Sequence, residues 1–512
     1  MKAQIVVNPA YAIGPIDPRI YSGFIEHLGR AVYEGIYEPG HPTADADGFR
    51  TDVLELVREL DMPLTRYPGG NFVSGYNWED GVGPKEKRPA RMDLAWASLE
   101  PNLFGTDEFI RWCRKANTEP MMAVNLGTRG PAEAQALVEY CNHPSGTALS
   151  ELRRRNGSDA PHHVKVWCLG NEMDGTWQTG AKTATEYARV AAEAAKMMRW
   201  TDPGIELVVC GSSFPAMTTY GEWDMTVLEH TYDLVDYLSL HLYFANRKDN
   251  MPGFLGQTHY MDQHIENTIA FCDSIRAKKH SLKRMMLSFD EWNVWYHSNE
   301  KDKQASKWAV ANNLLEDVYD MADLLVNGAA LISLLNHADR VKIACLAQTV
   351  NVIAPIMTEP GGRAWRQTIF YPQYYTSKFA RGTALRQAVD CPTYEADVSN
   401  RPERTVVTQG IPYLASSVIH NSERGELVVL AVNRNLEEPM DLTVSMEGFD
   451  PLCLIEAVEI ANPDLGAVNS AHAEAVKPVQ HGRVRLDNST LHAELAAASW
   501  NLIRVKLSSP KV

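Results

Sequence analysis

Two glutamates, Glu172 and Glu291, follow short apolar runs at residues 164–169 and 285–289. Both runs have the length and apolar content of a buried β-strand. A carboxylate where a buried strand ends is a typical placement for a catalytic group. The separation is 291 − 172 = 119 residues, which leaves room for three strand–helix units of roughly 30 to 40 residues each. We therefore expect the two carboxylates on strands of one barrel.

The chain between residues 20 and 348 alternates short apolar runs with segments of helical spacing. The runs predict eight strands, at residues 20–25, 63–67, 121–126, 164–169, 206–211, 237–243, 285–291 and 341–348. A second apolar run at 331–335 competes with the last of them. Eight strand–helix repeats predict an α/β fold, the (β/α)₈ TIM barrel.

Helices are predicted between these strands from apolar residues that recur three or four positions apart. Asp45 and Asp47 precede the first helix as candidate caps, and Thr183 with Glu186 has the spacing of a capping box. The predicted helices cover residues 49–60, 107–116, 132–140, 183–197, 308–325 and 373–380.

The chain changes character after about residue 370, where short β-branched runs separated by turn residues predict an antiparallel β-sandwich. The runs lie at residues 405–407, 414–419, 427–432, 442–444, 484–486 and 500–505. An early strand at residues 3–7 precedes every helix, and prolines then separate it from the barrel. We predict a catalytic barrel over residues 18–370 and a sandwich over 371–512 that is joined by residues 1–17.

The formal net charge of −15 argues against a nucleic-acid partner, because phosphate binding needs a basic patch. Nowhere do 18 apolar residues follow one another, and the N-terminal apolar run is too short for a secretion signal. We therefore expect a soluble, cytoplasmic protein with no membrane partner. The 8 cysteines are scattered without a CxxC pair, so a disulfide framework is not expected.

Catalytic groups in barrels of this type lie at the carboxyl ends of the strands. Here those ends carry Glu172 and Glu291 among other polar side chains. Glycoside hydrolysis needs two acids with unequal pKa values, one to protonate the leaving oxygen and one to attack or to activate water. The two glutamates therefore predict a glycosidase.

Five short motifs stand at these strand ends. They are GFIEHLG at 23–29, RYPGGNF at 66–72, GNEMDG at 170–175, DEWN at 290–293 and AQTVN at 347–351. In this order, over nearly the whole chain, they resemble the α-L-arabinofuranosidases of glycoside hydrolase family 51.

The resemblance implies an exo-acting, retaining enzyme that releases terminal non-reducing α-L-arabinofuranosyl residues from arabino-oligosaccharides or arabinoxylan fragments. It implies Glu172 as general acid/base and Glu291 as the nucleophile that forms a covalent glycosyl-enzyme. It also implies a homo-oligomer, often a hexamer, and no cofactor. The residues that it places around the terminal sugar are Glu26, Arg66, Asn71, Asn171, Tyr243 and Gln348. We add His241 to this substrate-binding set, because it stands at the end of the strand predicted at 237–243.

Plainer interpretations of single residues stay open. Arg66 also fits a structural ion-pair partner, and Glu26 fits a residue that supports the site without touching the substrate. His27 and His241 suggest a metal, but the chain has no HxH or HExxH spacing, so no metal site is predicted. For the tryptophans, stacking on a sugar and packing in the core are equally open; these are Trp96, Trp292 and Trp295.

Other functions fit parts of the pattern. The same barrel and glutamate pair would serve a β-xylosidase or an endo-glucanase, because loops set glycosidic specificity. A metal-dependent hydrolase of the amidohydrolase kind is disfavoured by the missing HxH after the first strand. A carbohydrate-binding protein without catalysis is disfavoured because both acids are present.

Overall fold

The computed structural model describes residues 1–508. Eight parallel strands close into a barrel in the order β10-β11-β12-β3-β4-β7-β8-β9. Their bounds are β3 Ser22–Phe24, β4 Leu64–Tyr67, β7 Glu119–Ala123, β8 Val166–Leu169, β9 Glu206–Val209, β10 Tyr237–Phe244, β11 Met286–Val294 and β12 Val341–Leu346. Each overlaps a predicted strand, and the predicted (β/α)₈ barrel is confirmed. The prediction succeeds because strands buried on both faces are apolar along their whole length, as every residue of β8 is buried.

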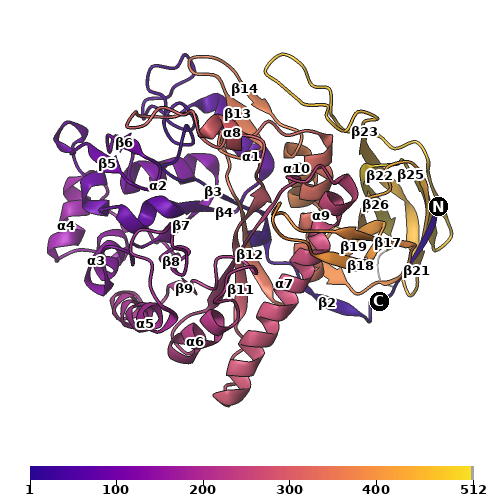
Figure 1. Cartoon of the computed structure of the whole chain (residues 1–512), viewed down its shortest axis with the longest axis horizontal. Coiled ribbons are helices and arrows are strands. Elements are labelled where there is room, and N and C mark those ends of the chain that lie inside the picture. The colour runs from indigo at the N-terminus through magenta and orange to yellow at the C-terminus, as the bar shows by residue number, and fades with distance from the viewer. Residues whose placement is uncertain (509–512) are drawn as a thin grey trace.

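Helices surround the barrel strands (Figure 1). Their bounds are α1 Thr51–Leu60, α2 Thr106–Ala116, α3 Pro131–Asn142, α4 Ala148–Arg155, α5 Ala184–Thr201, α6 Glu222–Thr231, α7 Met251–Lys278, α8 Asn299–Asp302, α9 Met321–Asn336 and α10 Phe370–Phe379. Short 3₁₀ turns and two small hairpins fill the loops: η1 Pro18–Tyr21, η2 Asn71–Gly75, η3 Trp78–Gly81, η4 Lys85–Lys87, β5 Arg91–Asp93 with β6 Ser98–Glu100, and β13 Ile356–Thr358 with β14 Ala364–Arg366. The capping box predicted at Thr183 is confirmed at the start of α5.

The helix predicted over residues 308–325 is wrong for most of its length. The backbone of Trp308, Ala311 and Leu315 has φ of 58°, 54° and 53°, a left-handed conformation that cannot continue an α-helix. The helix of this segment, α9, begins only after Asp320, whose side chain accepts a hydrogen bond from the backbone N–H of Asp323. The competing apolar run at 331–335 lies inside α9, so the eighth strand is the predicted one.

The predicted caps of the first helix are also wrong. Arg50 occupies the N-cap position of α1 without a side-chain hydrogen bond. Asp45 instead accepts hydrogen bonds from the backbone N–H groups of Asp47 and Phe49, at 2.9 and 3.1 Å. It therefore closes a turn that precedes the helix.

The chain from Thr383 onward, together with the N-terminal strands β1 and β2, forms two stacked sheets, in the orders β16-β1-β21-β25-β24 and β2-β15-β19-β20-β26-β22-β23. Strand β1 pairs in parallel with β21, and the other pairs are antiparallel. The bounds are β1 Lys2–Val7, β2 Ala12–Pro15, β15 Thr383–Leu385, β16 Ala388–Asp390, β19 Leu414–Asn421, β20 Glu426–Asn433, β21 Met440–Met446, β22 Pro451–Ala461, β23 Val479–Gln480, β24 Val484–Asp487, β25 Thr490–Leu495 and β26 Ser499–Leu507. The predicted sandwich is confirmed; the domain limits 18–370 and 371–512 stay a prediction.

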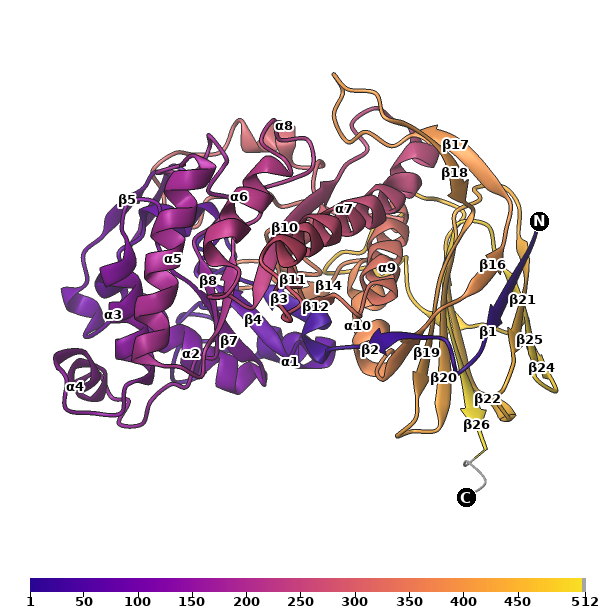
Figure 2. The ribbon, with the colours of Figure 1, turned by 90° about the horizontal axis from the view of Figure 1, so that it is seen from below.

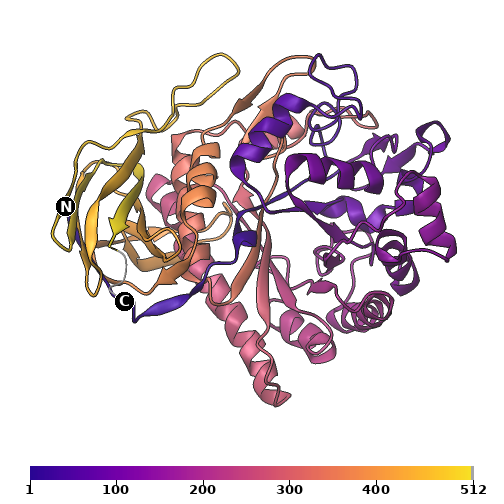
Figure 3. The same cartoon turned by 180° about the vertical axis from the view of Figure 1, so that it is seen from behind.

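The seven-stranded sheet is buried on both faces. One face packs on the five-stranded sheet, and the other joins the core of the barrel through α9 (Figure 2). Gly328 of α9 faces Trp500 of β26, where an added Cβ atom would stand 2.3 Å from the indole. A glycine at this position lets the helix approach the sheet closely. Seen from behind, the indigo N-terminal segment runs from the sheets to the barrel (Figure 3).

A separate hairpin of β17 Thr393–Asp397 and β18 Val407–Pro412 extends from the sandwich toward α7. Its loop, residues 398–406, reaches the carboxyl end of the barrel.

Within residues 1–508, every helix is too short or too polar to span a membrane. The eight cysteines are free thiols.

Candidate active site

Glu172 and Glu291 lie together at the carboxyl end of the barrel. Glu172 follows β8 after a sharp turn, in which Gly170 has φ 91° and Glu172 itself has φ 44°. Non-glycine residues adopt such a conformation mainly where their surroundings enforce it, often at functional sites. Glu291 lies within β11. One carboxylate oxygen of Glu172 stands within 4.8 Å of one of Glu291, so both can reach the same glycosidic bond.

Two donors hold the carboxylate of Glu291. The Nη1 atom of Arg66 donates to Oε1 at 2.8 Å, and the hydroxyl of Tyr243 donates to Oε2 at 2.9 Å. All three side chains are largely shielded from solvent, which strengthens charge-assisted hydrogen bonds. Both oxygens of Glu291 are therefore fixed in position, as the orientation of a nucleophile requires.

The environment of Glu172 favours its protonated form. Burial raises the pKa of the Glu172 carboxyl, and the negative charge of Glu291 raises it further. Hydrogen bonds from His241 Nδ1 at 2.8 Å and from Trp177 Nε1 at 2.6 Å act in the opposite direction. The net direction is upward, which suits a general acid that must keep its proton until the leaving group departs.

His241 joins Glu172 to a third acid, Asp290. Its Nε2 atom lies 2.9 Å from an oxygen of Asp290, while its Nδ1 atom contacts Glu172 and lies 3.6 Å from Glu291. Burial by itself lowers the pKa of His241, but the charge of Glu291 and the hydrogen bonds to Asp290 and Glu172 outweigh it and raise the pKa to about 10. A protonated His241 donates from both nitrogens, so it holds the Glu172 side chain in position; its proposed contact with the substrate stays a prediction.

Asn171 and Arg66 form a second link across the site. Arg66 Nη2 donates to Oδ1 of Asn171 at 2.7 Å. This contact orients the Asn171 amide so that its NH₂ group points away from Arg66. There Asn171 Nδ2 forms a long hydrogen bond to Gln178 Oε1, at 3.4 Å. The amide is therefore able to donate to a bound ligand.

Glu26 and Gln348 hold each other at the opposite wall. The backbone N–H of Glu26 donates to Gln348 Oε1 at 2.9 Å, and Gln348 Nε2 lies 3.3 Å from Glu26 Oε2. Burial and, next, the charge of Glu291 raise the pKa of Glu26 to about 8. Gly70 is needed beside it, because an added Cβ atom would stand 2.2 Å from Glu26 Oε2. Trp96 Nε1 also donates to Glu26, at 3.0 Å.

Asn71 differs from the other predicted residues. Among the described residues its side chain has no hydrogen-bond partner, and only its carbonyl accepts a long hydrogen bond from Gln178, at 3.4 Å. The side chain is partly exposed at the start of η2. The structure thus brings the predicted set to one end of the barrel and leaves the Asn71 amide open to a ligand.

Two family models match the chain. One is described as the α-L-arabinofuranosidase 1 domain and matches residues 56–265; the other is described as the α-L-arabinofuranosidase C-terminal domain and matches residues 290–499. A relative from Halalkalibacterium halodurans, named an intracellular exo-α-(1→5)-L-arabinofuranosidase, is 54% identical over 99% of both chains. A Bacillus subtilis relative, named an intracellular exo-α-(1→5)-L-arabinofuranosidase 1, is 52% identical over 99% of this chain and 100% of its own.

A solved structure agrees with these relatives. It is a family 51 α-L-arabinofuranosidase from Bifidobacterium longum, with a TM-score of 0.92 and 43% identity over 98% of this chain and 99% of that one. The chain belongs to the α-L-arabinofuranosidases of glycoside hydrolase family 51. Two further structures, a bifunctional glucanase-xylanase and a xyloglucanase, are each 13% identical with a TM-score of 0.57 and share only the fold with this arabinofuranosidase.

Three contacts of this arabinofuranosidase site were not predicted from the sequence. Asp290, Trp177 and Gln178 each hold a predicted residue in place. Asp290 adjoins Glu291 in sequence, and Trp177 stands five residues after Glu172, so proximity to the motifs was the only available signal. Among the tryptophans that were left open, Trp292 packs in the core, whereas Trp295 is partly exposed and lies with its ring 5.4 Å from that of Tyr243.

Within residues 1–508, two groups of side chains have a spacing that a metal ion would accept. In the first, Glu172, His241 and Glu291 each offer one atom within 4.8 Å of the others, and His241 already forms hydrogen bonds to Glu172 and Asp290. The second group is His297, Asp320 and Asp323. It stands at the start of α9, where Asp320 caps the helix.

The contact of Trp177 with the acid/base predicts a change in pH dependence. Trp177→Phe removes the indole N–H that stabilises the Glu172 carboxylate, so the pKa of Glu172 should rise. Because kcat/KM falls once the general acid loses its proton, we expect the basic limb of the kcat/KM profile to move to higher pH. Trp200→Phe is the matched control, since Trp200 is 78% exposed on α5. If the basic limb of the kcat/KM profile stays at its wild-type pH in Trp177→Phe, the ionisation of Glu172 does not determine that limb.

Proposed function

We propose that this chain is an exo-acting, retaining α-L-arabinofuranosidase. It removes terminal non-reducing α-L-arabinofuranosyl residues from arabino-oligosaccharides or arabinoxylan fragments. The observation that carries the mechanism is the approach of Glu172 and Glu291 oxygens within 4.8 Å. Retaining glycosidases hold their two carboxyl groups about 5 to 5.5 Å apart, whereas inverting ones leave roughly 6.5 to 9.5 Å for a water.

In the first step Glu291 attacks the anomeric carbon of the arabinofuranosyl group. The bond to the leaving oxygen breaks with its electron pair, and Glu172 gives that oxygen a proton. Glu291 is then joined covalently to the sugar, and Glu172 is an anion. The contacts from Arg66 and Tyr243 orient the attacking carboxylate during this step.

In the second step Glu172 acts as a base. It takes a proton from water, and the water oxygen attacks the anomeric carbon from the side that the leaving group vacated. The ester bond to Glu291 breaks and both glutamates return to their starting states. His241 supports this cycle because its positive charge stabilises the anionic Glu172 of the intermediate.

The remaining predicted residues bind the terminal sugar. Asn171 is placed to donate to the 2-hydroxyl, where hydrogen bonds strengthen in the transition state. Glu26 is protonated over much of the neutral range, so it both donates to and accepts from sugar hydroxyls. Asn71 and Gln348, which follow β4 and β12, complete the sugar-binding set.

The names of the relatives support finer proposals. Both are named exo-α-(1→5) enzymes and intracellular, which supports the α-(1→5) linkage as substrate and the cytoplasm as location. A homo-oligomer, with a hexamer as the form that the family resemblance implies, remains our proposal for the assembly. We also propose the barrel over residues 18–370 and the sandwich over 371–512 with residues 1–17.

Three nitrophenyl glycosides test the proposed specificity. The α-L-arabinofuranoside should be hydrolysed with a kcat/KM at least about a hundredfold above that of the β-D-xyloside and the β-D-glucoside, the scale that misfitted sugar hydroxyls cost. Release of nitrophenolate measures all three. Comparable rates on the xyloside or the glucoside would favour the β-xylosidase or glucanase alternative, which the relatives do not support.

A further inference from the structure

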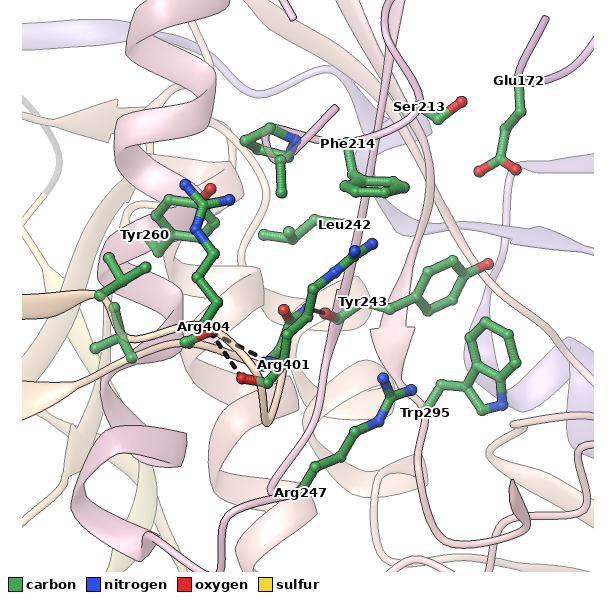
Figure 4. A pocket seen from close by; sticks show the side chains of 16 residues that line it. Glu172, Ser213, Phe214, Leu242, Tyr243, Arg247, Tyr260, Trp295, Arg401 and Arg404 are labelled. Atoms are coloured by element: carbon green, nitrogen blue, oxygen red, sulfur yellow. Dashed lines mark hydrogen bonds between the residues drawn. The ribbon is translucent and has the colours of Figure 1, made fainter. Parts of the chain in front are cut away.

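A cavity of about 280 Å³ opens beside Glu172 and Tyr243 (Figure 4). Its walls come from loops of the barrel and from the loop 398–406 of the sandwich hairpin. The lining includes the aromatic side chains Phe214, Tyr260 and Trp295. A group joined to the arabinose through the oxygen that Glu172 protonates would enter this cavity.

The sandwich loop is held against the barrel at this point. Asn400 Nδ2 donates to the carbonyl of Tyr243 at 2.7 Å, directly beside the hydroxyl-bearing side chain that holds the nucleophile. The Nζ atom of Lys248 pairs with Asp397 at 2.7 Å, and Asn250 Nδ2 donates to the carbonyl of Asp397 at 3.0 Å. The loop is therefore a fixed wall of the cavity.

Two arginines from different parts of the chain line this cavity. Arg247 follows β10, and Arg401 comes from the sandwich loop. Figure 4 shows Arg247 reaching toward Trp295 and Arg401 toward Phe214, while Arg404 turns toward Tyr260. Arg247 is exposed and Arg401 is partly exposed, so a ligand in the cavity can reach both guanidinium groups.

Neither of these two arginines is paired with an acid in the part of the chain that the structure describes. Arg401 instead lies over the ring of Phe214, at 4.6 Å. Glu403 and Asp317 act on Arg247 only at longer range. The acid among the lining residues is Glu172, which His241 and Trp177 already hold. In a chain of net charge −15, two unpaired arginines beside the acid/base form a local anion site.

We propose that this cavity binds a leaving group that carries a carboxylate, a uronic acid, with Arg247 and Arg401 as its partners. The inference rests on the proposed function, because it names the sugar on the far side of the bond that Glu172 and Glu291 cleave. A planar guanidinium matches a carboxylate in a bidentate contact. The volume suits a group of monosaccharide size, and the aromatic walls offer flat surfaces to the apolar face of a sugar ring.

Two disaccharides that differ in one group test the proposal. Both carry a terminal α-L-arabinofuranosyl residue, one on a hexose and the other on the corresponding hexuronic acid. The ratio of kcat/KM, acidic to neutral, should exceed one in the wild type. It should fall about tenfold in Arg247→Gln and in Arg401→Gln, the loss expected when a charge-assisted contact is removed. Added salt should lower the wild-type ratio, because exposed charges are screened.

Arg155→Gln is the matched control. Arg155 is an exposed arginine in the last turn of α4, so its loss changes the net charge equally but should leave the ratio unchanged. A wild-type ratio at or below one, or a ratio that neither cavity variant lowers, would overturn the proposal. Unfolding temperatures of the variants verify that they are folded.

A binding measurement separates failure of this inference from failure of the proposed function. Calorimetry with the free hexuronate and the free hexose should give tighter binding of the hexuronate to the wild type, and Arg401→Gln should remove the difference. Equal affinities would overturn the anion site even where both disaccharides are cleaved. If neither disaccharide is cleaved but the hexuronate binds more tightly, the anion site stands and the proposed reaction fails.

Discussion

Glu291→Ala is expected to lower kcat on the order of 10⁴-fold or more, the scale seen when a covalent nucleophile is removed. Alanine has no oxygen to attack the anomeric carbon, and no neighbouring acid takes over, because Glu172 lies on the side of the leaving oxygen. The loss should be similar for sugar and nitrophenol leaving groups, since the missing bond is the same. Steady-state hydrolysis of a nitrophenyl α-L-arabinofuranoside measures it.

Azide provides the control for this variant. With Glu291 shortened, a small anion can enter the space of the carboxylate and attack from the same face, which gives the arabinosyl azide of inverted, β configuration. Glu300→Ala serves as the unrelated acid variant, because Glu300 is 83% exposed in its surface pair with Lys303, and it should keep wild-type activity. Substantial turnover by Glu291→Ala without azide would remove Glu291 from the nucleophile role.

Glu172→Ala is expected to lose activity in a way that depends on the leaving group. General acid catalysis contributes roughly 10² to 10⁴-fold, so hydrolysis of an arabino-oligosaccharide should fall by that amount. Nitrophenolate leaves without help from a proton, so the first step on a nitrophenyl substrate should be much less affected. Comparison of kcat/KM on the two substrates gives the difference directly.

The second step of the same variant supplies its control. Without Glu172 no base activates water, so the glycosyl-enzyme should accumulate on a nitrophenyl substrate, and azide should release it as the arabinosyl azide of retained, α configuration. The α product here and the β product from Glu291→Ala would distinguish the two glutamates. Equal losses on every leaving group would contradict the acid/base assignment of Glu172.

The barrel could be predicted from the sequence because the barrel strands are buried on both faces and therefore appear in the sequence as apolar runs. Strand β8 is the clearest case, with all of Val166–Leu169 buried. The placement of Glu172 and Glu291 at the carboxyl end of the barrel was predictable for the same reason, since each follows such a run. The helix over 308–325 failed because apolar residues at helical spacing also occur in an irregular segment that packs on the core. Local spacing alone cannot separate the two cases.

The contacts in the site between residues far apart in the chain could not be predicted from the sequence. Nothing in residues 398–406 indicates that a loop of the sandwich reaches the barrel, since its anchor is a contact from Asn400 to the carbonyl of Tyr243, 157 positions away. The link from Asp290 through His241 to Glu172 joins three strands and appears only once the barrel is closed. Sequence motifs identified the side chains; the folded chain showed which of them hold the others.

The configuration of the first product tests the central claim most directly. Proton NMR recorded during hydrolysis of an α-L-arabinofuranoside, before the free sugar equilibrates, resolves the two anomers. Double displacement through Glu291 predicts that α-L-arabinofuranose appears first and the β anomer only later. First appearance of the β anomer would show a single displacement by water and would contradict the roles assigned to both glutamates.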